Sequence, residues 1–257
     1  MDCSILVTVR TASTRLPKKA LLKINGTPFI KILVDQIKKS DGVKKVIICT
    51  TREKSDDELV KYLRKNKIDV FRGDNQDILK RLYSAAKKYR LSRFIVVEGD
   101  TLFCDSSIID DTCKKLSKSD YDFISWKNLP FGVSPLGIKT NKLRKLVENK
   151  KTKDTENGWG KIITDSGFFK VGQLQPKNKK LIRPEIRLSI DYKEDFELAR
   201  KIYENLSEKP SSLSDVIQLL DENQGLLKIN KHAQKKYERN LEKNRSKIIM
   251  KRSRTHT

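Results

Sequence analysis

Short apolar stretches alternate with amphipathic ones along most of the chain. Residues 4–9 form an apolar run of strand length, and residues 28–39 carry Phe29, Ile32 and Leu33 at helical spacing. The same alternation predicts strands at 43–50, 68–71, 93–97, 121–126, 168–171 and 187–190, and helices starting at 55, 76, 106 and 192. Strands that are apolar on both faces and separated by helices are typical of a parallel sheet covered on both sides. We therefore expect a three-layer α/β/α fold with a mostly parallel sheet.

The pattern indicates one core and a distinct C-terminal end. We find no internal repeat and no second core, so we predict a single domain at 1–225 and a basic appendage at 226–257. This appendage holds eleven Lys and Arg residues against Glu238 and Glu242. A helical stretch at 233–249 has a poor apolar face, so we expect the appendage to dock loosely and to add little to the core.

Composition and charge restrict the class of protein. The 257 residues are 37% hydrophobic, which is enough for a real core despite 35% charged residues. The formal net charge of +23 favours anionic partners, including non-specific contact of the appendage with polyanions. Apolar runs such as 94–97 are far shorter than the roughly 20 residues of a membrane helix. The first residues lack the basic region of a secretion signal, so a cytoplasmic location is expected.

Cysteine and histidine exclude several kinds of site. The four cysteines include no C-x-x-C pair, and we expect neither zinc nor disulfides on them. Cys3 and Cys49 lie in apolar runs of strand length, where reduced, buried thiols are expected. His232 and His256 are the only histidines, and both lie in the appendage. A Ser-His-Asp triad, a Cys-His pair or an H-E-x-x-H zinc helix therefore cannot form within residues 1–231. Catalysis there must use carboxylates, cations, hydroxyls or metal ions.

The loop at 10–19 is the first candidate site, because ligands of an open parallel sheet bind at the carboxyl ends of its strands. It reads R-T-A-S-T-R-L-P-K-K and combines cations, hydroxyls and backbone N–H donors, as a phosphate site requires. A solvated basic loop is the alternative. The sequence contains neither a Walker pattern nor G-x-G-x-x-G, so side chains would provide most of the contacts to a triphosphate.

Two acidic residues also follow predicted strands. Asp100 comes after the apolar strand at 93–97, and Asp191 after the one at 187–190. A carboxylate at a buried strand end is costly unless it binds something, and Mg²⁺ beside phosphates is a common partner. We predict that Asp100 and Asp191 ligate Mg²⁺, while a helix-capping role is the alternative for each.

Four segments together resemble a known family. They read V-R-T-A-S-T-R-L-P-K-K-A-L at 9–21, F-R-G-D-N-Q-D-I-L-K-R-L-Y-S-A-A at 71–86, V-V-E-G-D-T-L-F-C-D at 96–105 and I-D-Y-K-E-D-F-E-L-A-R at 190–200. The chain thereby resembles the sugar-acid cytidylyltransferases, the family of CMP-Kdo synthetase and of spore-coat polysaccharide cytidylyltransferase-like proteins. The resemblance spans about residues 3–206. It implies a nucleotide-diphospho-sugar transferase-like (GT-A-like) fold, CTP as the nucleotide, Mg²⁺, and release of pyrophosphate.

The resemblance also implies roles for particular residues. The residues that would bind the nucleotide are Arg10, Ser13, Arg15, Lys19, Arg72 and Arg81. Of these, Arg15 and Lys19 would act in catalysis together with Asp100, and Asp100 and Asp191 would hold the metal. Lys18 stands where the family usually has glycine, and Leu102 replaces the proline of the family's G-D-x-P.

The implied reaction is attack of an acceptor oxygen on the α-phosphorus of CTP. The acceptor would be a sugar acid or a phosphorylated sugar, contacted by Asn157, Trp159 and Lys161. A surface loop or a homodimer contact is the alternative for those three residues. Two other functions stay open, namely a metal-dependent glycosyltransferase that uses a nucleotide sugar and a non-catalytic polyanion-binding protein on the same fold.

Overall fold

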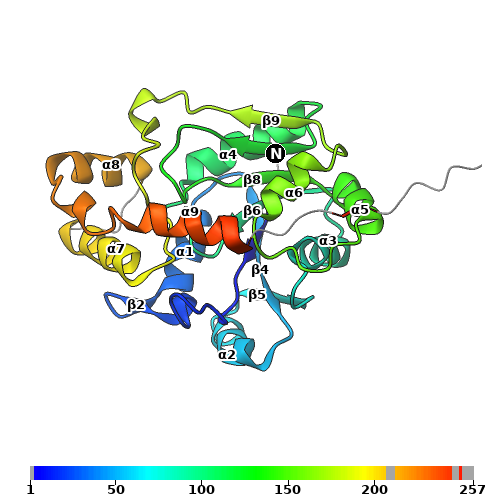
Figure 1. Ribbon diagram of the computed structural model, residues 1–257, viewed down its shortest axis with the longest axis horizontal. Helices are drawn as coiled ribbons and strands as arrows, with labels where there is room; N and C mark the ends of the chain where they lie inside the picture. Colours follow the sequence, from blue (N-terminus) through cyan, green and yellow to red (C-terminus); the bar gives the residue numbers. More distant parts are fainter. Residues whose placement is uncertain (1–2, 207–211, 245–248, 251–257) are drawn as a thin grey trace, which may run out of the picture.

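The computed structural model describes residues 3–206, 212–244 and 249–250. Its centre is a seven-stranded sheet in the order β5-β4-β1-β6-β8-β7-β9 (Figure 1). The strands are β1 (Cys3–Thr8), β4 (Val43–Thr51), β5 (Asp69–Gly73), β6 (Arg93–Glu98), β7 (Phe123–Trp126), β8 (Leu136–Lys139) and β9 (Val171–Leu174). A separate hairpin pairs β2 (Lys23–Ile24) with β3 (Thr27–Pro28).

The sheet is mostly parallel. β5, β4, β1 and β6 pair in parallel, whereas β8 runs antiparallel to both of its neighbours, β6 and β7. β7 and β9 pair in parallel again. The predicted parallel sheet is thus confirmed, with the addition of β8 in a stretch where the sequence pattern is irregular.

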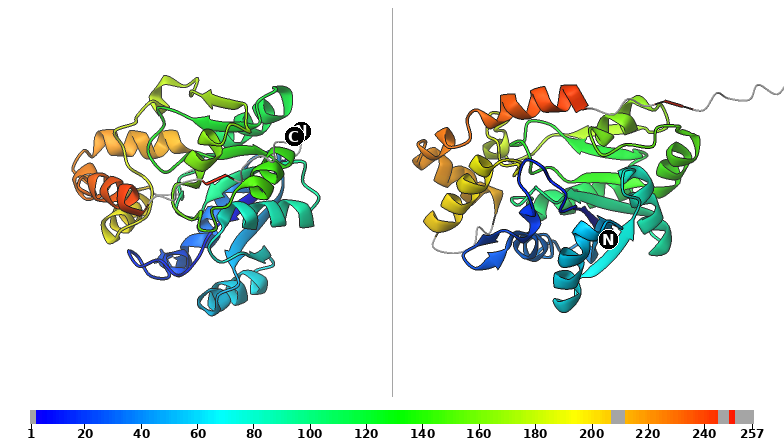
Figure 2. Two further views of the ribbon diagram at one scale, coloured as in Figure 1. Left: turned by 45° about the vertical axis from the view of Figure 1, so that its right-hand side comes forward. Right: turned by 60° about the horizontal axis from the view of Figure 1, so that its bottom comes forward.

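Helices cover both faces of the sheet. They are α1 (Phe29–Ile37), α2 (Asp57–Lys65), α3 (Ile78–Lys88), α4 (Ser106–Lys118), α5 (Thr140–Asn149), α6 (Trp159–Asp165), α7 (Lys193–Asn205), α8 (Leu213–Glu222) and α9 (Ala233–Asn244). One core cluster contains the buried residues of α1, α2, α4, α7 and α8, and the other those of α3, α5 and α6. Because successive residues of β1 point to opposite faces, Ile5 belongs to the first cluster and Leu6 to the second. The three-layer architecture is therefore as predicted (Figure 2).

Two late elements differ from the predicted ones. The strand expected at 168–171 begins only at Val171, and the one expected at 187–190 is reduced to a single bridge between Phe131 and Arg187. This segment still lies against the sheet, because the amide of Ile190 donates to the carbonyl of Asp100 over 3.0 Å. Residues 187–190 are therefore apolar because they are buried, although they do not form a continuous strand.

The prediction that no disulfide forms is wrong for one pair of cysteines. Cys3 of β1 and Cys113 of α4 are disulfide-bonded, with their Cα atoms 6.1 Å apart. The sequence places them 110 residues apart, but the alternation of β1 directs Cys3 to the face that α4 covers. Cys49 is free and buried, as expected, and Cys104 is also free and buried.

The C-terminal segment also differs from a loosely docked appendage. Asn230 is buried, and its side chain donates to the carbonyl of Arg187 and to Asp195 over 3.1 and 2.9 Å. In α9, the ring of Tyr237 packs against that of Phe131, with centroids 5.1 Å apart. The described part of the segment therefore contacts the body closely, while the division into a domain and an appendage at residue 225 stays a prediction.

No helix in the described ranges has the length and apolar character to cross a membrane.

Candidate functional site

A cavity of about 650 Å³ opens at the carboxyl ends of β1 and β6. Gly99, just after β6, allows the two strand ends to approach, because a Cβ there would lie 2.7 Å from the carbonyl oxygen of Thr8. Of the predicted nucleotide and metal residues, those that line the cavity are Arg10, Ser13, Arg15, Lys19, Arg81, Asp100 and Asp191. The structure therefore brings together side chains from widely separated parts of the chain.

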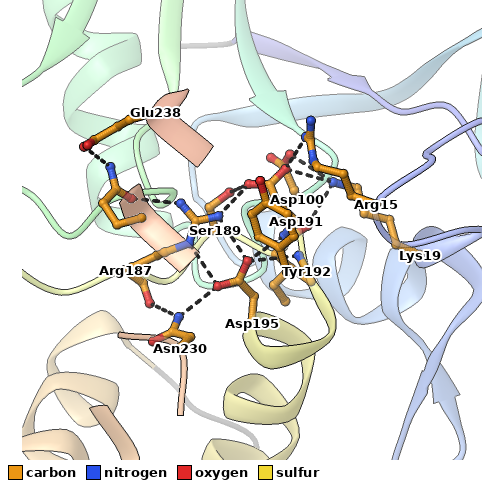
Figure 3. A network of polar contacts seen from close by, with 12 residues as sticks. Arg15, Lys19, Asp100, Arg187, Ser189, Asp191, Tyr192, Asp195, Asn230 and Glu238 are labelled. Atoms are coloured by element: carbon orange, nitrogen blue, oxygen red, sulfur yellow. Dashed lines mark hydrogen bonds and ion pairs between the residues drawn. The ribbon is translucent and has the colours of Figure 1, made fainter. Parts of the chain in front are cut away.

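Lys19 stands between the two predicted metal ligands. Its ammonium lies 3.1 Å from Asp100 Oδ2 and 3.8 Å from Asp191 Oδ1, and it donates to the carbonyl of Ile190 over 2.9 Å. Arg15 donates to the same oxygen of Asp191 over 2.9 Å (Figure 3). The loop at 10–19 thus places two cations directly against two carboxylates.

Further hydrogen bonds hold the carboxylate of Asp191 in place. Its Oδ2 accepts from Arg187 over 2.8 Å and from the hydroxyl of Ser189 over 2.9 Å. Arg187 also donates to Asp195, which in turn accepts from the backbone amides of Asp191 and Tyr192 (Figure 3). Asp195 therefore stabilises the first turn of α7 and fixes the orientation of Arg187. The sequence analysis predicted neither of these two roles of Asp195.

Burial and charge act differently on the acidic groups. Burial, opposed by Lys19, raises the pKa of Asp100 above its ordinary value. Burial and then the charge of Asp100 raise the pKa of Glu98 to about 7. At Asp191 burial is outweighed by Lys19, Arg15 and Arg187, which hold its pKa below its ordinary value. The site thus contains acidic groups that repel one another and are balanced by cations.

The donor set fits a hard divalent cation completed by substrate oxygens. Within the residues that the structure describes, no three His, Cys, Asp or Glu side chains form a ready-made metal cage. Mg²⁺ is commonly held by one or two carboxylates together with phosphate oxygens and water. Asp100 and Asp191 meet this requirement, because one ammonium group is within 3.8 Å of both.

A second charged cluster lies in the wall of the same cavity. Arg81 of α3 is buried, with its Nη2 2.7 Å from Glu156, and Arg10 lies 3.5 Å from the same carboxylate. Glu156 itself has a raised pKa because of burial, which the two arginines oppose. The sequence prediction included both arginines but missed Glu156, which adjoins the predicted Asn157.

The remaining predicted residues have separate surroundings. Ser13 lines the cavity, and its hydroxyl accepts from the amide of Leu16 over 3.3 Å. Arg72 does not line it, because its guanidinium donates to the carbonyls of Thr51 and Glu53 and to Asp57. Lys18, where the resemblance expects glycine, has a φ of 52°, the left-handed conformation that glycine adopts most readily.

The residues predicted to contact the acceptor lie in the cavity wall. Asn157, Trp159 and Lys161 all line it, at the start of α6. Trp159 is buried, and its indole N–H donates to Glu98 over 2.8 Å. Glu98 was missed by sequence reasoning, although it is the last residue of β6 and stands two residues before Asp100.

Comparisons with known proteins agree with this geometry. A family model described as "Cytidylyltransferase" matches residues 4–236. The uncharacterized protein MJ1063 of Methanocaldococcus jannaschii is 31% identical over 92% of this chain and 98% of its own. The spore coat polysaccharide biosynthesis protein SpsF of Bacillus subtilis is 26% identical over 86% of this chain and 95% of its own. A solved cytidylyltransferase structure from Leptospira borgpetersenii superimposes with a TM-score of 0.79 at 25% identity, covering 88% of this chain and 97% of that one.

Proposed function

Because the chain belongs to the cytidylyltransferase family, and is therefore a nucleotidyltransferase, we propose that it transfers CMP from CTP to a sugar acid and releases pyrophosphate. The single observation that carries this proposal is the position of Lys19. Its ammonium contacts Asp100 and lies beside Asp191, while Arg10 and Arg15 of the same loop line the cavity. This combination offers cations for a triphosphate and carboxylates for a metal ion within one pocket.

The proposed reaction is an in-line displacement. A hydroxyl oxygen of the acceptor forms a bond to the α-phosphorus of CTP, the bond to the β-phosphate oxygen breaks, and the acceptor proton is released. Arg15 and Lys19 would stabilise the charge that develops on the leaving pyrophosphate. No histidine is required, in keeping with the histidine-free body of the chain.

Asp100 and Asp191 would hold Mg²⁺. When bound, the ion would neutralise phosphate charge and favour ionisation of the acceptor hydroxyl. Arg187 and Ser189 donate to Asp191, so they keep that carboxylate oriented toward the cavity. Lys19 neutralises the repulsion between the two carboxylates and would shift toward the phosphates as they enter.

Arg81 and Glu156 are the residues we assign to the nucleoside end. The side chains of this pair are buried and line the same cavity as Asp100 and Asp191. A carboxylate can accept from the exocyclic amine of cytosine, whereas uracil has an oxygen at that position. Arg72 is not included, because its guanidinium is engaged at the end of β4.

For the acceptor we propose a sugar acid used in surface polysaccharide or glycan synthesis. The name of the SpsF relative, with its role in spore coat polysaccharide, supports this class. Lys161 in the cavity lining offers a partner for a sugar carboxylate. A cytoplasmic location and a homodimer stay predictions.

The test is a thermal-shift comparison of the four nucleoside triphosphates with Mg²⁺. A ligand at about 100 times its Kd should stabilise the protein by roughly 2.7 kcal/mol. CTP should give the largest shift, and pyrophosphate should appear only when a sugar acid is added. Equal shifts with UTP or ATP would contradict the cytidine assignment. Stabilisation by an intact nucleotide sugar without any consumption of CTP would favour a glycosyltransferase instead.

A further inference from the structure

The C-terminal segment is attached to the body on two sides of the molecule. At one side, Asn230 donates to the carbonyl of Arg187 and to Asp195. At the other, Ile249 and Met250 pair with the chain just after α5. The amide of Lys151 donates to the carbonyl of Ile249 over 2.6 Å, and Met250 forms an antiparallel bridge with Lys150. Figure 1 shows α9 lying across the molecule between these sides.

The inner face of α9 follows a helical spacing. Ala233, Tyr237 and Leu241 are separated by four residues each, and they are buried or half-buried. The charged residues of the helix, among them Lys235, Arg239, Glu242 and Lys243, are exposed. The helix therefore turns its few apolar residues toward the body and most of its charges toward solvent, while the ammonium of Lys236 lies 4.4 Å from the ring centroid of Tyr192.

The inner face reaches the cavity itself. Tyr237, Asn240 and Leu241 line the same cavity as Asp100 and the basic loop. Tyr237 is held there by Phe131, with ring centroids 5.1 Å apart, and by Arg187, whose guanidinium lies 5.2 Å from the tyrosine ring. Since Arg187 also donates to Asp191, the docking of α9 is linked to the orientation of a predicted metal ligand.

The lining contributed by α9 differs in chemistry from the phosphate loop. Tyr237 and Leu241 offer apolar surface and Asn240 an amide, and Phe131 and Trp126 extend this surface in the cavity lining. Aromatic faces with a few placed polar groups suit the C–H faces and hydroxyls of a sugar better than a triphosphate. This wall is therefore suited to the acceptor.

We propose that α9 forms the acceptor-side wall of the cavity, and that Tyr237, Asn240 and Leu241 are specificity-determining residues for the sugar acid. The proposal rests on the proposed function. It gives the C-terminal segment a role in the active site that its basic composition does not indicate, because the three residues of α9 that line the cavity are uncharged.

The experiment compares Asn240→Ala and Leu241→Phe with Arg239→Gln, an exposed control on the same helix, in the full chain. CTP·Mg²⁺ binding is followed by intrinsic fluorescence, because the chain has only two tryptophans, Trp126 and Trp159, and both line the cavity. Turnover is followed by pyrophosphate release with a set of sugar acids and sugar phosphates that starts with Kdo. Asn240→Ala truncates a half-buried amide and should fold even if Leu241→Phe disturbs docking.

We expect both variants to raise the KM for the acceptor by about tenfold, corresponding to about 1.4 kcal/mol, with the KM for CTP changed by less than about twofold. Arg239→Gln should leave both constants unchanged. An unchanged acceptor KM in Asn240→Ala and Leu241→Phe would overturn the assignment of α9 to the acceptor but not the proposed function. Equal increases in the KM values for the acceptor and for CTP, or faster turnover, would have the same consequence. A wild-type protein that binds CTP but turns over no acceptor would overturn the proposed function as well.

Discussion

Asp56 accepts hydrogen bonds from both the backbone amide and the hydroxyl of Thr11, over 2.7 and 2.6 Å. Its other oxygen accepts from the hydroxyl of Thr50 and the amide of Thr51, at the end of β4. One fully buried carboxylate thus joins the start of the basic loop to the neighbouring strand. Thr11 follows Arg10 directly, so this contact between residues 45 apart in sequence anchors the start of the basic loop.

The first prediction is that Asp56→Ala destabilises the protein and weakens CTP binding. Leaving several buried donors without an acceptor should cost about 2–4 kcal/mol of unfolding free energy. The basic loop should then be less well ordered, so the Kd for CTP should rise. Denaturant unfolding and a fluorescence titration measure the two effects. Asp57→Ala, which removes an exposed carboxylate paired with Arg72, is the control.

The second prediction concerns the pH dependence of the same contact. Burial acts to raise the pKa of Asp56, but hydrogen bonds from Thr11, Thr50 and Thr51 hold it below its ordinary value of 3.8. Its stabilising effect is therefore complete above the unfolded-state pKa and is lost as the pH falls through the lower folded-state pKa. The stability difference between wild type and Asp56→Asn should be constant at neutral pH and shrink below about pH 4. A difference that is the same at all pH values would show that the charge of Asp56 is not involved.

The third prediction tests the metal assignment. Asp100→Asn removes a charge at nearly constant shape, so turnover should fall by at least about 100-fold while the fold survives. The melting temperature without metal should stay the same or rise, because a half-buried carboxylate near Asp191 and Glu98 is electrostatically unfavourable. Pyrophosphate release across a Mg²⁺ titration and thermal melting measure both effects. Asp120→Asn, at an exposed ion pair with Lys170, is the control. If Asp100→Asn releases pyrophosphate at the wild-type rate when Mg²⁺ is limiting, Asp100 does not bind the metal.

The fourth prediction concerns a buried ion pair behind the nucleoside end of the cavity. Asp77 caps α3 through the amide of Lys80, accepts from the hydroxyl of Thr155 and pairs with the buried ammonium of Lys150. Asp77→Ala would leave that ammonium without its carboxylate and should cost about 3–5 kcal/mol. Adding Lys150→Met should recover part of the loss. Because Thr155 precedes Glu156, both variants should also weaken CTP binding, and denaturant unfolding with CTP titration would reveal whether they do.

The fifth prediction concerns the cysteines. Denatured protein without reductant should show two reactive thiols, from Cys49 and Cys104, and four after reduction. Closing a loop of 110 residues constrains the unfolded chain, so Cys113→Ser should lower the unfolding free energy by roughly 3–5 kcal/mol. Thiol titration and denaturant unfolding test this. Four thiols without reductant would mean that the bond does not form under those conditions.

The local pattern of the sequence was sufficient for the layers of the fold and for part of the site. Strands that are apolar on both faces are buried only in a sheet that helices cover on both sides. Parallel strands bring their carboxyl ends to the same edge of that sheet. For that reason the loop at 10–19 and Asp100 could be expected to meet, and Lys19 does contact Asp100. Asp191 also lies beside Lys19, although the strand predicted before it is reduced to a single bridge.

Only the tertiary structure decided the contacts made by pairing distant segments. Arg72 turns to the end of β4 and away from the cavity, whereas Glu98, Glu156 and Tyr237 enter its lining. The bond between Cys3 and Cys113 likewise depends on which helix covers which face. The type of a residue and its neighbours in sequence determine what it can bind. Which residues it contacts depends on how segments far apart in sequence pack together, and a local sequence pattern contains no information about that packing. In α9 the sequence indicated only a helix with a poor apolar face, and the fold alone turned Ala233, Tyr237 and Leu241 toward the body and brought the last two into the cavity lining.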